Sequence, residues 1–331
     1  MPGFLGRRPL FHLGRPSQQA HAAHFDRRRR QRCGARSAAG AGASSKEGPF
    51  NVVVTGSSKG IGLALAREFV RAGDSVLICS RNASQVAAAT EDLQRLAASS
   101  ALAGPTQVIA GAPCNVANPA EVAALADFAH DRLGTVDIWI NNAGSNAYKY
   151  STLTELDPAD LVNIVETNLL GVMLGCREAI RVMRTQATGG HIMNMDGAGA
   201  DGGATPRFAA YGATKRGLAQ LGKSLQAELK MQGINNVGIH NLSPGMVTTE
   251  LLMSGTDTST AKFFVNCLAE SPETVAEYLV PRVRRVPAES RSLGGISSQY
   301  IRYLTKAKAY TQILMRLVAG QRKNRWVAED Q

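Results

Sequence analysis

Short apolar runs alternate with longer amphipathic stretches along most of this 331-residue chain. The apolar runs are rich in Val and Ile, which is typical of strands buried on both faces of a sheet. They predict strands at residues 51–55, 75–79, 107–110, 136–140, 191–195 and 237–242. Between these runs, apolar residues recur at helical spacing. That spacing predicts helices at residues 60–72, 83–99, 119–133, 161–183 and 211–231.

The regular alternation of strands and helices predicts an α/β fold with a single Rossmann-type, doubly wound parallel sheet. Right-handed crossovers then place helices on both faces of the sheet. We assign this core to residues 47–250.

The alternation ends near residue 248. Residues 248–296 are polar and rich in Ser, Thr and Arg, and we expect them to cover the substrate. Residues 299–325 form a basic amphipathic segment, for which a terminal helix is favoured over a partner contact or a membrane-surface contact. We therefore treat residues 251–331 as a substrate-covering segment with a C-terminal basic helix, either part of the core or appended to it.

Positive charge is concentrated at the start of the chain. The net charge is +11, but residues 1–46 hold ten of the 37 Lys and Arg residues against a single acid, Asp26. A leader rich in Arg, Ala and Ser, nearly free of acids and without a long apolar segment, is typical of an organelle transit peptide. A disordered basic tail, or a nuclear signal at residues 27–30, has a similar composition. The rest of the chain is nearly neutral, so we expect no nucleic-acid partner.

Composition also disfavours a membrane anchor, a disulfide framework and a metal site. No stretch approaches the ~20 consecutive apolar residues of a membrane-spanning helix. The five cysteines are scattered and form no CxxC pair, so we expect buried free thiols and no metal site.

A glycine-rich turn, VVVTGSSKGIG (52–62), joins the first predicted strand to the first predicted helix. Glycines allow the backbone to turn sharply and to approach a pyrophosphate, which the free N–H groups of the helix N-terminus bind. We therefore predict a dinucleotide site that includes Gly56, Ser57, Ser58, Lys59, Gly60, Ile61 and Gly62.

The end of the second predicted strand indicates which dinucleotide is bound. An NAD site usually has an acidic residue there for the ribose 2′-hydroxyl. This chain has Arg81 instead, and Lys59 lies inside the glycine turn. Both bases can pair with a 2′-phosphate, so the sequence favours NADPH.

Four motifs in the same order resemble the short-chain dehydrogenase/reductase family over residues 50–250. They are TGSSKGIG (55–62), NNAG (141–144), YGATK (211–215) and SPGMV (243–247). The resemblance implies that Asn168, Tyr211 and Lys215 are catalytic, with Tyr211 as the acid and Lys215 also holding the nicotinamide ribose. It adds to the cofactor site Asn115, which stands where an Asp is usual, and Val116, Asn142, Ala143, Gly144, Pro244, Gly245 and Val247.

The spacing of Tyr211 and Lys215 has a physical consequence. One helical turn apart, they lie on the same face of a helix. An ammonium group beside a phenol favours the phenolate, so we expect the pKa of Tyr211 to fall from ~10 toward neutrality. Such a phenol is suited to proton transfer.

A narrower resemblance concerns the stretches GHIMNMDGAGADGG, SPGMVTTELLMSG and AYTQILMRLVAGQRKNRWV. They resemble the chlorophyll(ide) b reductases, closest to their non-yellow-colouring-like type, which lacks the membrane spans of its longer relative. The resemblance implies NADPH-dependent reduction of the C7 formyl group of chlorophyll b or chlorophyllide b to 7-hydroxymethyl chlorophyll a, the first step of chlorophyll b breakdown. It further implies a chloroplast transit peptide and peripheral action at the stromal face of thylakoids. A membrane-bound homologous reductase and light-harvesting antenna proteins are then expected partners, in a homo- or hetero-oligomer.

The chain departs from the family pattern where a serine is usual, thirteen residues before the tyrosine. That position is Ala198, or Gly197 if the loop carries one extra residue. Asp196 is a candidate replacement donor if a dry site keeps it protonated. Otherwise it caps the loop or binds backbone amides.

Two other functions remain open. One is an NADPH reductase of another apolar carbonyl. The other is a non-catalytic NADP-binding scaffold subunit of a reductase or antenna complex. The missing serine and the basic C-terminal segment suit a scaffold, whereas the intact Asn168, Tyr211 and Lys215 favour an enzyme.

Overall fold

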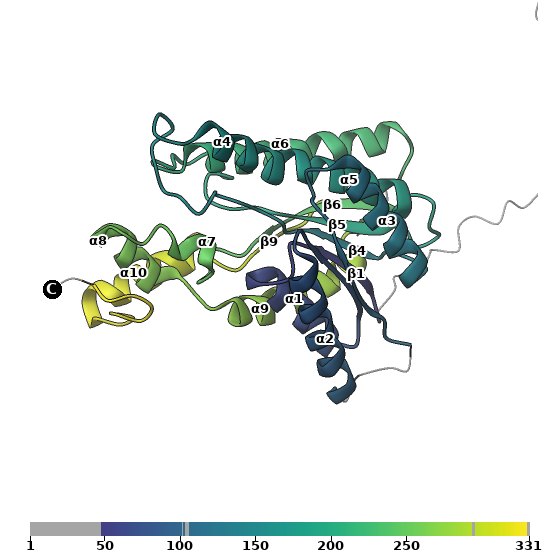
Figure 1. The fold of residues 1–331 in the computed structure, drawn as a ribbon, viewed down its shortest axis with the longest axis horizontal. Helices are drawn as coiled ribbons and strands as arrows, with labels where there is room; N and C mark the ends of the chain where they lie inside the picture. Colours follow the sequence, from purple (N-terminus) through teal and green to yellow (C-terminus); the bar gives the residue numbers. More distant parts are fainter. Residues whose placement is uncertain (1–47, 101, 103–105, 293–294, 330–331) are drawn as a thin grey trace, which may run out of the picture. The chain divides into compact units, whose positions relative to one another are not determined.

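The computed structural model describes residues 48–100, 102, 106–292 and 295–329 (Figure 1). The predicted transit peptide, residues 1–46, lies outside the described residues, and so does Cys33. Within the described residues, Cys79, Cys114, Cys176 and Cys267 are free and buried.

Seven parallel strands form the central sheet, in the spatial order β3-β2-β1-β4-β5-β6-β9. This arrangement confirms the predicted doubly wound fold. The strand order reverses direction between β1 and β4, which is the place where α/β sheets bind ligands. The strands are β1 (Asn51–Thr55), β2 (Ser75–Ser80), β3 (Ile109–Pro113), β4 (Ile138–Asn141), β5 (Gly190–Met195), β6 (Val237–Ser243) and β9 (Tyr300–Arg302).

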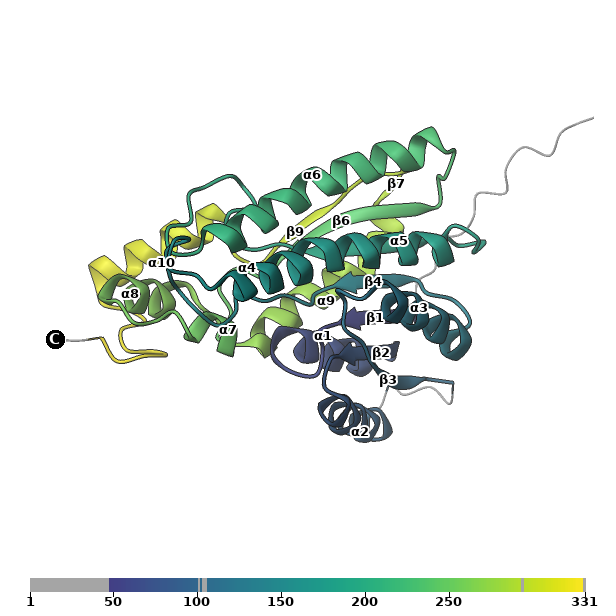
Figure 2. The same cartoon turned by 45° about the horizontal axis from the view of Figure 1, so that its top comes forward.

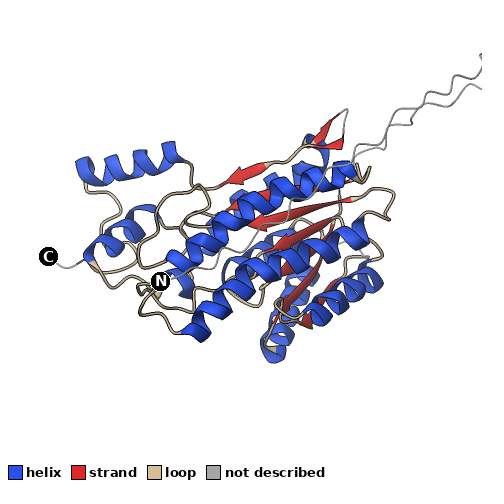
Figure 3. Ribbon diagram, turned by 90° about the horizontal axis from the view of Figure 1, so that it is seen from above, coloured by secondary structure: helices blue, strands red, loops and turns tan. Residues whose placement is uncertain are grey.

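Alternate residues of the strands face two separate cores. In β1, Val52 and Val54 face one core and Val53 faces the other. Figure 2 shows a helix layer on each side of the sheet, and Figure 3 shows the strands in red between them. Burial of both faces explains why the strands read as continuous apolar runs. The first layer is α1 (Gly60–Arg71), α2 (Ala83–Ser99) and α9 (Pro272–Glu289), and the second is α3 (Pro119–Leu133), α5 (Gly171–Met183) and α6 (Ala209–Met231).

Most predicted bounds lie close to the observed ones, and β3 shows the clearest shift. The prediction begins at Gln107, but the strand begins at Ile109. The side-chain amide of Gln107 donates to the carbonyls of Val70 at 3.0 Å and Asp74 at 2.8 Å. Gln107 thus ties the segment before β3 to the end of α1.

The helix predicted at residues 161–183 is longer and less regular than expected. It begins as α4 (Pro158–Val165), passes through one π-helical turn, η1 (Glu166–Leu170), and continues as α5. This 26-residue stretch contains an 18-residue window with a mean hydropathy of 1.3, so by length and composition alone it could cross a membrane, which the count of consecutive apolar residues did not anticipate. In the structure it packs on α3, α6 and β4 as part of the second helix layer.

The polar stretch 248–296 contains helices that its composition did not predict. They are α7 (Glu250–Met253), α8 (Ser259–Leu268) and α9, followed by the short strands β7 (Arg291–Ser292) and β8 (Gly295–Ile296). Pro281 and Pro287 lie inside α9 and argue against a helix at the sequence level. Packing overrides them, because α9 lies on α1 and Arg284 pairs with buried Asp74 at 2.8 Å.

The basic segment 299–325 forms two elements and not one helix. Its first residues are β9, which pairs with β6 and extends the central sheet. The predicted terminal helix follows as α10 (Lys306–Ala319), which packs on α8.

Candidate active site

A pocket of about 1010 Å³ opens at the carboxyl ends of the central strands. Every residue predicted to bind the cofactor lines this pocket, with the exception of Ser57. Asn168 lies behind the pocket wall. The pocket residues come from the glycine turn, from the segments after β2, β3, β4, β5 and β6, from helix α6, and from β9 and the start of α10.

The glycine turn has the geometry of a phosphate cradle. Gly56 and Gly60 have φ values of +62° and +58°, which favour glycine. A Cβ on Gly62 would lie 2.4 Å from the carbonyl oxygen of Gly56. No side chain caps the N-terminus of α1, so its first N–H groups are available to an anion.

Ser57 is the one predicted cofactor residue that the structure turns away from the pocket. Its hydroxyl donates to the carbonyl of Val54 at 2.6 Å and accepts from the Cys79 N–H at 3.2 Å. The side chain thus braces the glycine turn against β1 and β2, because a buried hydroxyl needs partners.

Asn142 and Thr55 hold the glycine turn against the end of β4. The Asn142 side chain donates to the carbonyls of Thr55 and Gly56, both at 2.9 Å. The Oδ1 atom of Asn142 and the Oγ atom of Ser80 are buried and have no hydrogen-bond partner among the described residues. Unsatisfied polar atoms beside an open glycine cradle fit a polar ligand such as a dinucleotide.

The two bases predicted for a 2′-phosphate differ in their surroundings. Arg81 follows β2, is exposed, and has no acidic partner within the part of the chain that is described. Lys59 Nζ lies 2.5 Å from Glu250 Oε2 at the start of α7, and this hydrogen bond raises the pKa of Lys59. Arg81 is therefore open to a phosphate, whereas Lys59 is paired with Glu250.

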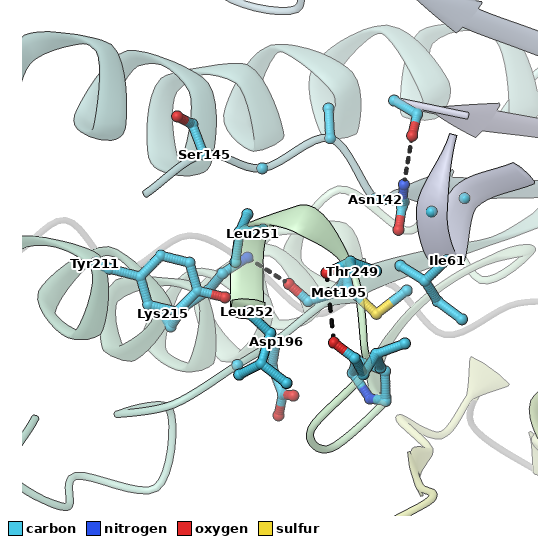
Figure 4. Close-up of a pocket in the computed structure, with 18 of the residues that line it drawn as sticks. Ile61, Asn142, Ser145, Met195, Asp196, Tyr211, Lys215, Thr249, Leu251 and Leu252 are labelled. Atoms are coloured by element: carbon cyan, nitrogen blue, oxygen red, sulfur yellow. Dashed lines mark hydrogen bonds between the residues drawn. The ribbon is translucent and has the colours of Figure 1, made fainter. Parts of the chain in front are cut away.

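Tyr211 and Lys215 reach the pocket from the first turns of α6 (Figure 4). Lys215 is buried, and its Nζ lies 5.4 Å from the centroid of the Tyr211 ring and donates to the carbonyl of Met195 at 3.0 Å. Phe208 stacks on Tyr211 with 4.3 Å between ring centroids, and Tyr150 stacks on Phe208 at 4.5 Å. The stack fixes the direction of the phenol.

Burial shifts the pKa values of both members of this pair. It raises the pKa of Tyr211, with the charge of Asp196 adding to the effect. It also lowers the pKa of Lys215 to about 8. The predicted lowering of the Tyr211 pKa is therefore wrong, because desolvation dominates and Lys215 Nζ donates to the Met195 carbonyl. Tyr211 is a protonated phenol at neutral pH, the form that can give a proton to a carbonyl oxygen.

Asn168 is fully buried in the π-helical turn η1. Its Oδ1 accepts from the Ser145 N–H at 2.7 Å, and its Nδ2 donates to the Ser145 carbonyl at 2.7 Å and to Thr214 Oγ1 at 3.3 Å. Gly144 lies between it and Lys215, since a Cβ there would be 3.5 Å from Asn168 Oδ1 and 3.9 Å from Lys215 Nζ. The structure thus places Asn168 near the pair, where it holds the loop after β4.

The loop after β5 lacks a hydroxyl at the position that faces the phenol. Gly197 faces Tyr211, since a Cβ on Gly197 would lie 2.3 Å from Tyr211 Oη. Two positions, Gly197 and Ala198, were considered from the sequence for the missing serine. Gly197 is the one that faces the phenol.

Asp196 pairs with a tyrosine whose role was not predicted from the sequence. Tyr300, on β9, donates to Asp196 Oδ2, and Oδ1 is buried without a hydrogen-bond partner among the described residues. Burial raises the pKa of Asp196. Among the described residues the carboxyl group therefore bonds to Tyr300, and no bond from a backbone amide to it is seen.

The apolar wall of the pocket was not predicted from the sequence. No short motif marks these residues, because they come from loops and from β9, far apart in the chain. The only local signal in the sequence is a few isolated leucines within the polar residues 248–296. The wall includes Tyr148, Tyr150, Phe208, Met246, Leu251, Leu252, Tyr300 and Leu304.

Known proteins resemble most of this chain in sequence. The model of the short chain dehydrogenase family matches residues 51–260. The protein "Chlorophyll(ide) b reductase NOL, chloroplastic" of Oryza sativa subsp. japonica is 54% identical over 282 residues, which are 85% of this chain and 79% of that protein. The protein of the same name from Arabidopsis thaliana is 54% identical over 282 residues, 85% of this chain and 78% of that protein.

Solved structures with low sequence identity share the fold. An alcohol dehydrogenase from Thermococcus sibiricus, complexed with 5-hydroxy-NADP, aligns with a TM-score of 0.60 at 22% identity, over 76% of this chain and 96% of that chain. A short-chain type dehydrogenase/reductase from Mycobacterium marinum aligns with a TM-score of 0.63 at 23% identity, over 77% and 94% of the two chains.

Proposed function

The chain belongs to the short-chain dehydrogenase/reductase family, whose cofactors are nicotinamide dinucleotides, and we propose that it is an NADPH-dependent chlorophyll(ide) b reductase. It reduces the C7 formyl group of chlorophyll b or chlorophyllide b to a hydroxymethyl group, giving 7-hydroxymethyl chlorophyll a. The observation that carries this proposal is the 54% identity over 85% of the chain to reductases of that name.

The residues of the pocket support an aldehyde reduction. When bound, NADPH supplies the hydride that adds to the formyl carbon. Tyr211 gives its phenolic proton to the formyl oxygen, so the products are the alcohol and NADP⁺. The Lys215 ammonium stabilises the phenolate left behind and holds the nicotinamide ribose. Asn168 keeps the loop after β4 in place beside Lys215.

The absence of a serine fits this substrate class. A hydroxyl in the oxyanion position contributes up to ~10²–10³ in rate in preorganised sites. An aldehyde is more electrophilic than a ketone, so Tyr211 alone suffices. The small side chains at Gly197 and Ala198, with the apolar wall opposite, leave room for a flat macrocycle.

NADPH is favoured over NADH by the end of β2. Arg81 is exposed at the pocket, and it stands at the position where an NAD site usually has an acidic residue. Its guanidinium can form charge-assisted hydrogen bonds with a 2′-phosphate.

The location and partners follow from the same assignment. The basic leader acts as a chloroplast transit peptide, and the protein works peripherally at the stromal face of thylakoids. It forms a homo- or hetero-oligomer, with a membrane-bound homologous reductase and light-harvesting antenna proteins as partners. Exposed apolar residues on α4 and η1, among them Val162 and Val165, support a subunit contact at that surface.

A product assay tests the function. The purified protein is incubated with NADPH and detergent-dispersed chlorophyll b, and the pigments are separated by chromatography. We expect 7-hydroxymethyl chlorophyll a to form. A protein that binds NADPH but forms no product would be the scaffold considered as an alternative. Turnover of a steroid or retinoid aldehyde without turnover of chlorophyll b would indicate a reductase of another apolar carbonyl.

A further inference from the structure

One face of α10 is apolar and open to solvent. Tyr310, Leu314, Leu317 and Val318 are 71%, 59%, 69% and 77% exposed. Their spacing places them in one stripe along the helix, which we call the α10 stripe. The opposite side of α10 rests on α8, where Arg316 is buried (Figure 1). A continuous exposed apolar stripe of this size marks a docking surface.

The chain segment that contains the α10 stripe is mainly basic. From Tyr300 to Ala328 the chain has seven Lys and Arg residues and no Asp or Glu. Some of these bases pair with Glu270 or Glu329, which are largely buried. Arg302, Lys306, Lys308 and Lys323 form no ion pair with an acidic residue among the described residues.

Another exposed apolar surface, on α4, is bordered by acidic residues, of which Asp160 pairs with Lys149. On α4, Val162 and Val165 are 52% and 40% exposed. The acids Asp157, Asp160 and Glu166 lie beside them in the sequence. An anionic surface would repel this face and attract the α10 stripe, so the two faces suit different partners.

We propose that the α10 stripe docks on the surface of an anionic lipid bilayer. An amphipathic helix that combines an apolar face with flanking bases lies in the membrane interface, and both hydrophobic burial and attraction to anionic headgroups stabilise it. Apolar side chains of the stripe enter the headgroup region, while Lys306, Lys308 and Lys323 remain near the headgroups.

The start of α10 lies at the pocket, so docking of α10 on a bilayer would bring the membrane close to the pocket. Leu304 and Lys306, at the start of the helix, line the pocket. A bilayer held against α10 therefore lies beside the pocket, from which a lipid-soluble pigment can enter without crossing water. This last step rests on the proposed function, but the lipid contact does not.

Vesicle flotation tests the docking with the full chain. Vesicles of phosphatidylcholine alone are compared with vesicles that also contain about 30% phosphatidylglycerol. We expect the wild type to bind the anionic vesicles more strongly, and less at high salt. The double variant Leu314→Ser/Val318→Ser should bind them about tenfold more weakly, because two exposed apolar side chains are lost.

A matched variant separates the α10 stripe from the rest of the surface. Leu153→Ser/Val162→Ser makes the same two changes at positions that are 55% and 52% exposed. It should bind like the wild type. Residues 1–46 are the same in every variant, so their positive charge cannot produce the difference. Equal binding by the two double variants would overturn the proposal.

A local probe reports the contact itself. Leu317→Trp should shift its emission to the blue and be quenched by brominated lipid, whereas Leu153→Trp should not respond. Sedimentation without vesicles tests a second copy as the occupant instead. A dimer lost only in Leu314→Ser/Val318→Ser, or no response of Leu317→Trp, would contradict lipid docking. Tyr211→Phe should still bind vesicles, so failure of the proposed catalysis remains distinguishable.

Discussion

Gly197 leaves the space that the phenolic oxygen of Tyr211 occupies. A Cβ on Gly197 would lie 2.3 Å from Tyr211 Oη, and stacking on Phe208 holds the ring where it is. The serine missing from this loop has therefore not left an empty position that a serine side chain could fill again.

Gly197→Ser should lower the turnover of chlorophyll b and not improve it. The new side chain forces the Tyr211 ring to move, and a displacement of about 1 Å at a reacting group can cost ~10²-fold in rate. Steady-state kinetics measure the effect, with Ala198→Ser as the control that adds the same hydroxyl one residue later. A gain in kcat for Gly197→Ser would show that a serine side chain fits beside the Tyr211 phenol and would contradict this prediction.

The activity should fall as the pH rises through about 8. Burial lowers the pKa of Lys215 to about 8, so the ammonium that stabilises the Tyr211 phenolate is lost above this pH. The pH profile of kcat/KM reports the pKa of groups in the free enzyme. Lys215→Arg keeps its charge over this range, so its remaining activity should show no alkaline fall near pH 8. If Lys215→Arg showed the same fall in activity near pH 8 as the wild type, the titrating group would not be Lys215.

Asp196→Asn should retain nearly normal turnover and gain stability at neutral pH. Burial raises the pKa of Asp196, so the folded state binds more protons than the unfolded state above about pH 4, and stability falls as the pH rises. An amide has no such dependence. We expect Tm at about pH 7.5 to rise by about 2–4 °C, with the difference vanishing near pH 4. A large loss of kcat would instead identify Asp196 as a proton donor in the reaction.

Arg81→Ala should raise the KM for NADPH by about 10–100-fold, the loss expected for charge-assisted hydrogen bonds, and leave the KM for NADH nearly unchanged. Isothermal titration with each cofactor gives the same comparison for binding. Equal losses for both cofactors would mean that Arg81 does not contact the 2′-phosphate.

Glu250→Gln should tighten NADPH binding by up to about fivefold. Lys59 Nζ is 2.5 Å from Glu250 Oε2, and an exposed pair of this kind contributes at most about 1 kcal/mol. Its removal frees Lys59 for the phosphate. Weaker binding by the variant would indicate that Glu250 orders the turn and does not compete for Lys59.

The core of the fold and half of the site could be predicted from local signals. Strands buried on both faces read as apolar runs, and the glycine turn and the Tyr211–Lys215 spacing each follow from a few adjacent residues. The failures come from tertiary contacts. Helix α9 forms despite Pro281 and Pro287 because it packs on α1. Ser57 lies in a turn whose sequence is typical of phosphate binding, but its hydroxyl donates to the Val54 carbonyl instead of facing the pocket.

Long-range contacts explain the part of the site that was missed. Tyr300 meets Asp196 only because β9 pairs with β6, and no pattern near either residue indicates that pairing. The pKa of Tyr211 was predicted to fall from its spacing to Lys215 alone. The structure adds the burial of both groups, which reverses the direction.

The central claim is that Tyr211 protonates the formyl oxygen of chlorophyll b. The direct test is the rate of 7-hydroxymethyl chlorophyll a formation by Tyr211→Phe, measured by chromatography at saturating NADPH, with Tyr310→Phe on the far helix as the control. We predict a loss of about 10²–10⁴-fold for Tyr211→Phe, unchanged NADPH binding, and normal activity for Tyr310→Phe. Product formation by Tyr211→Phe at the wild-type rate would contradict the account.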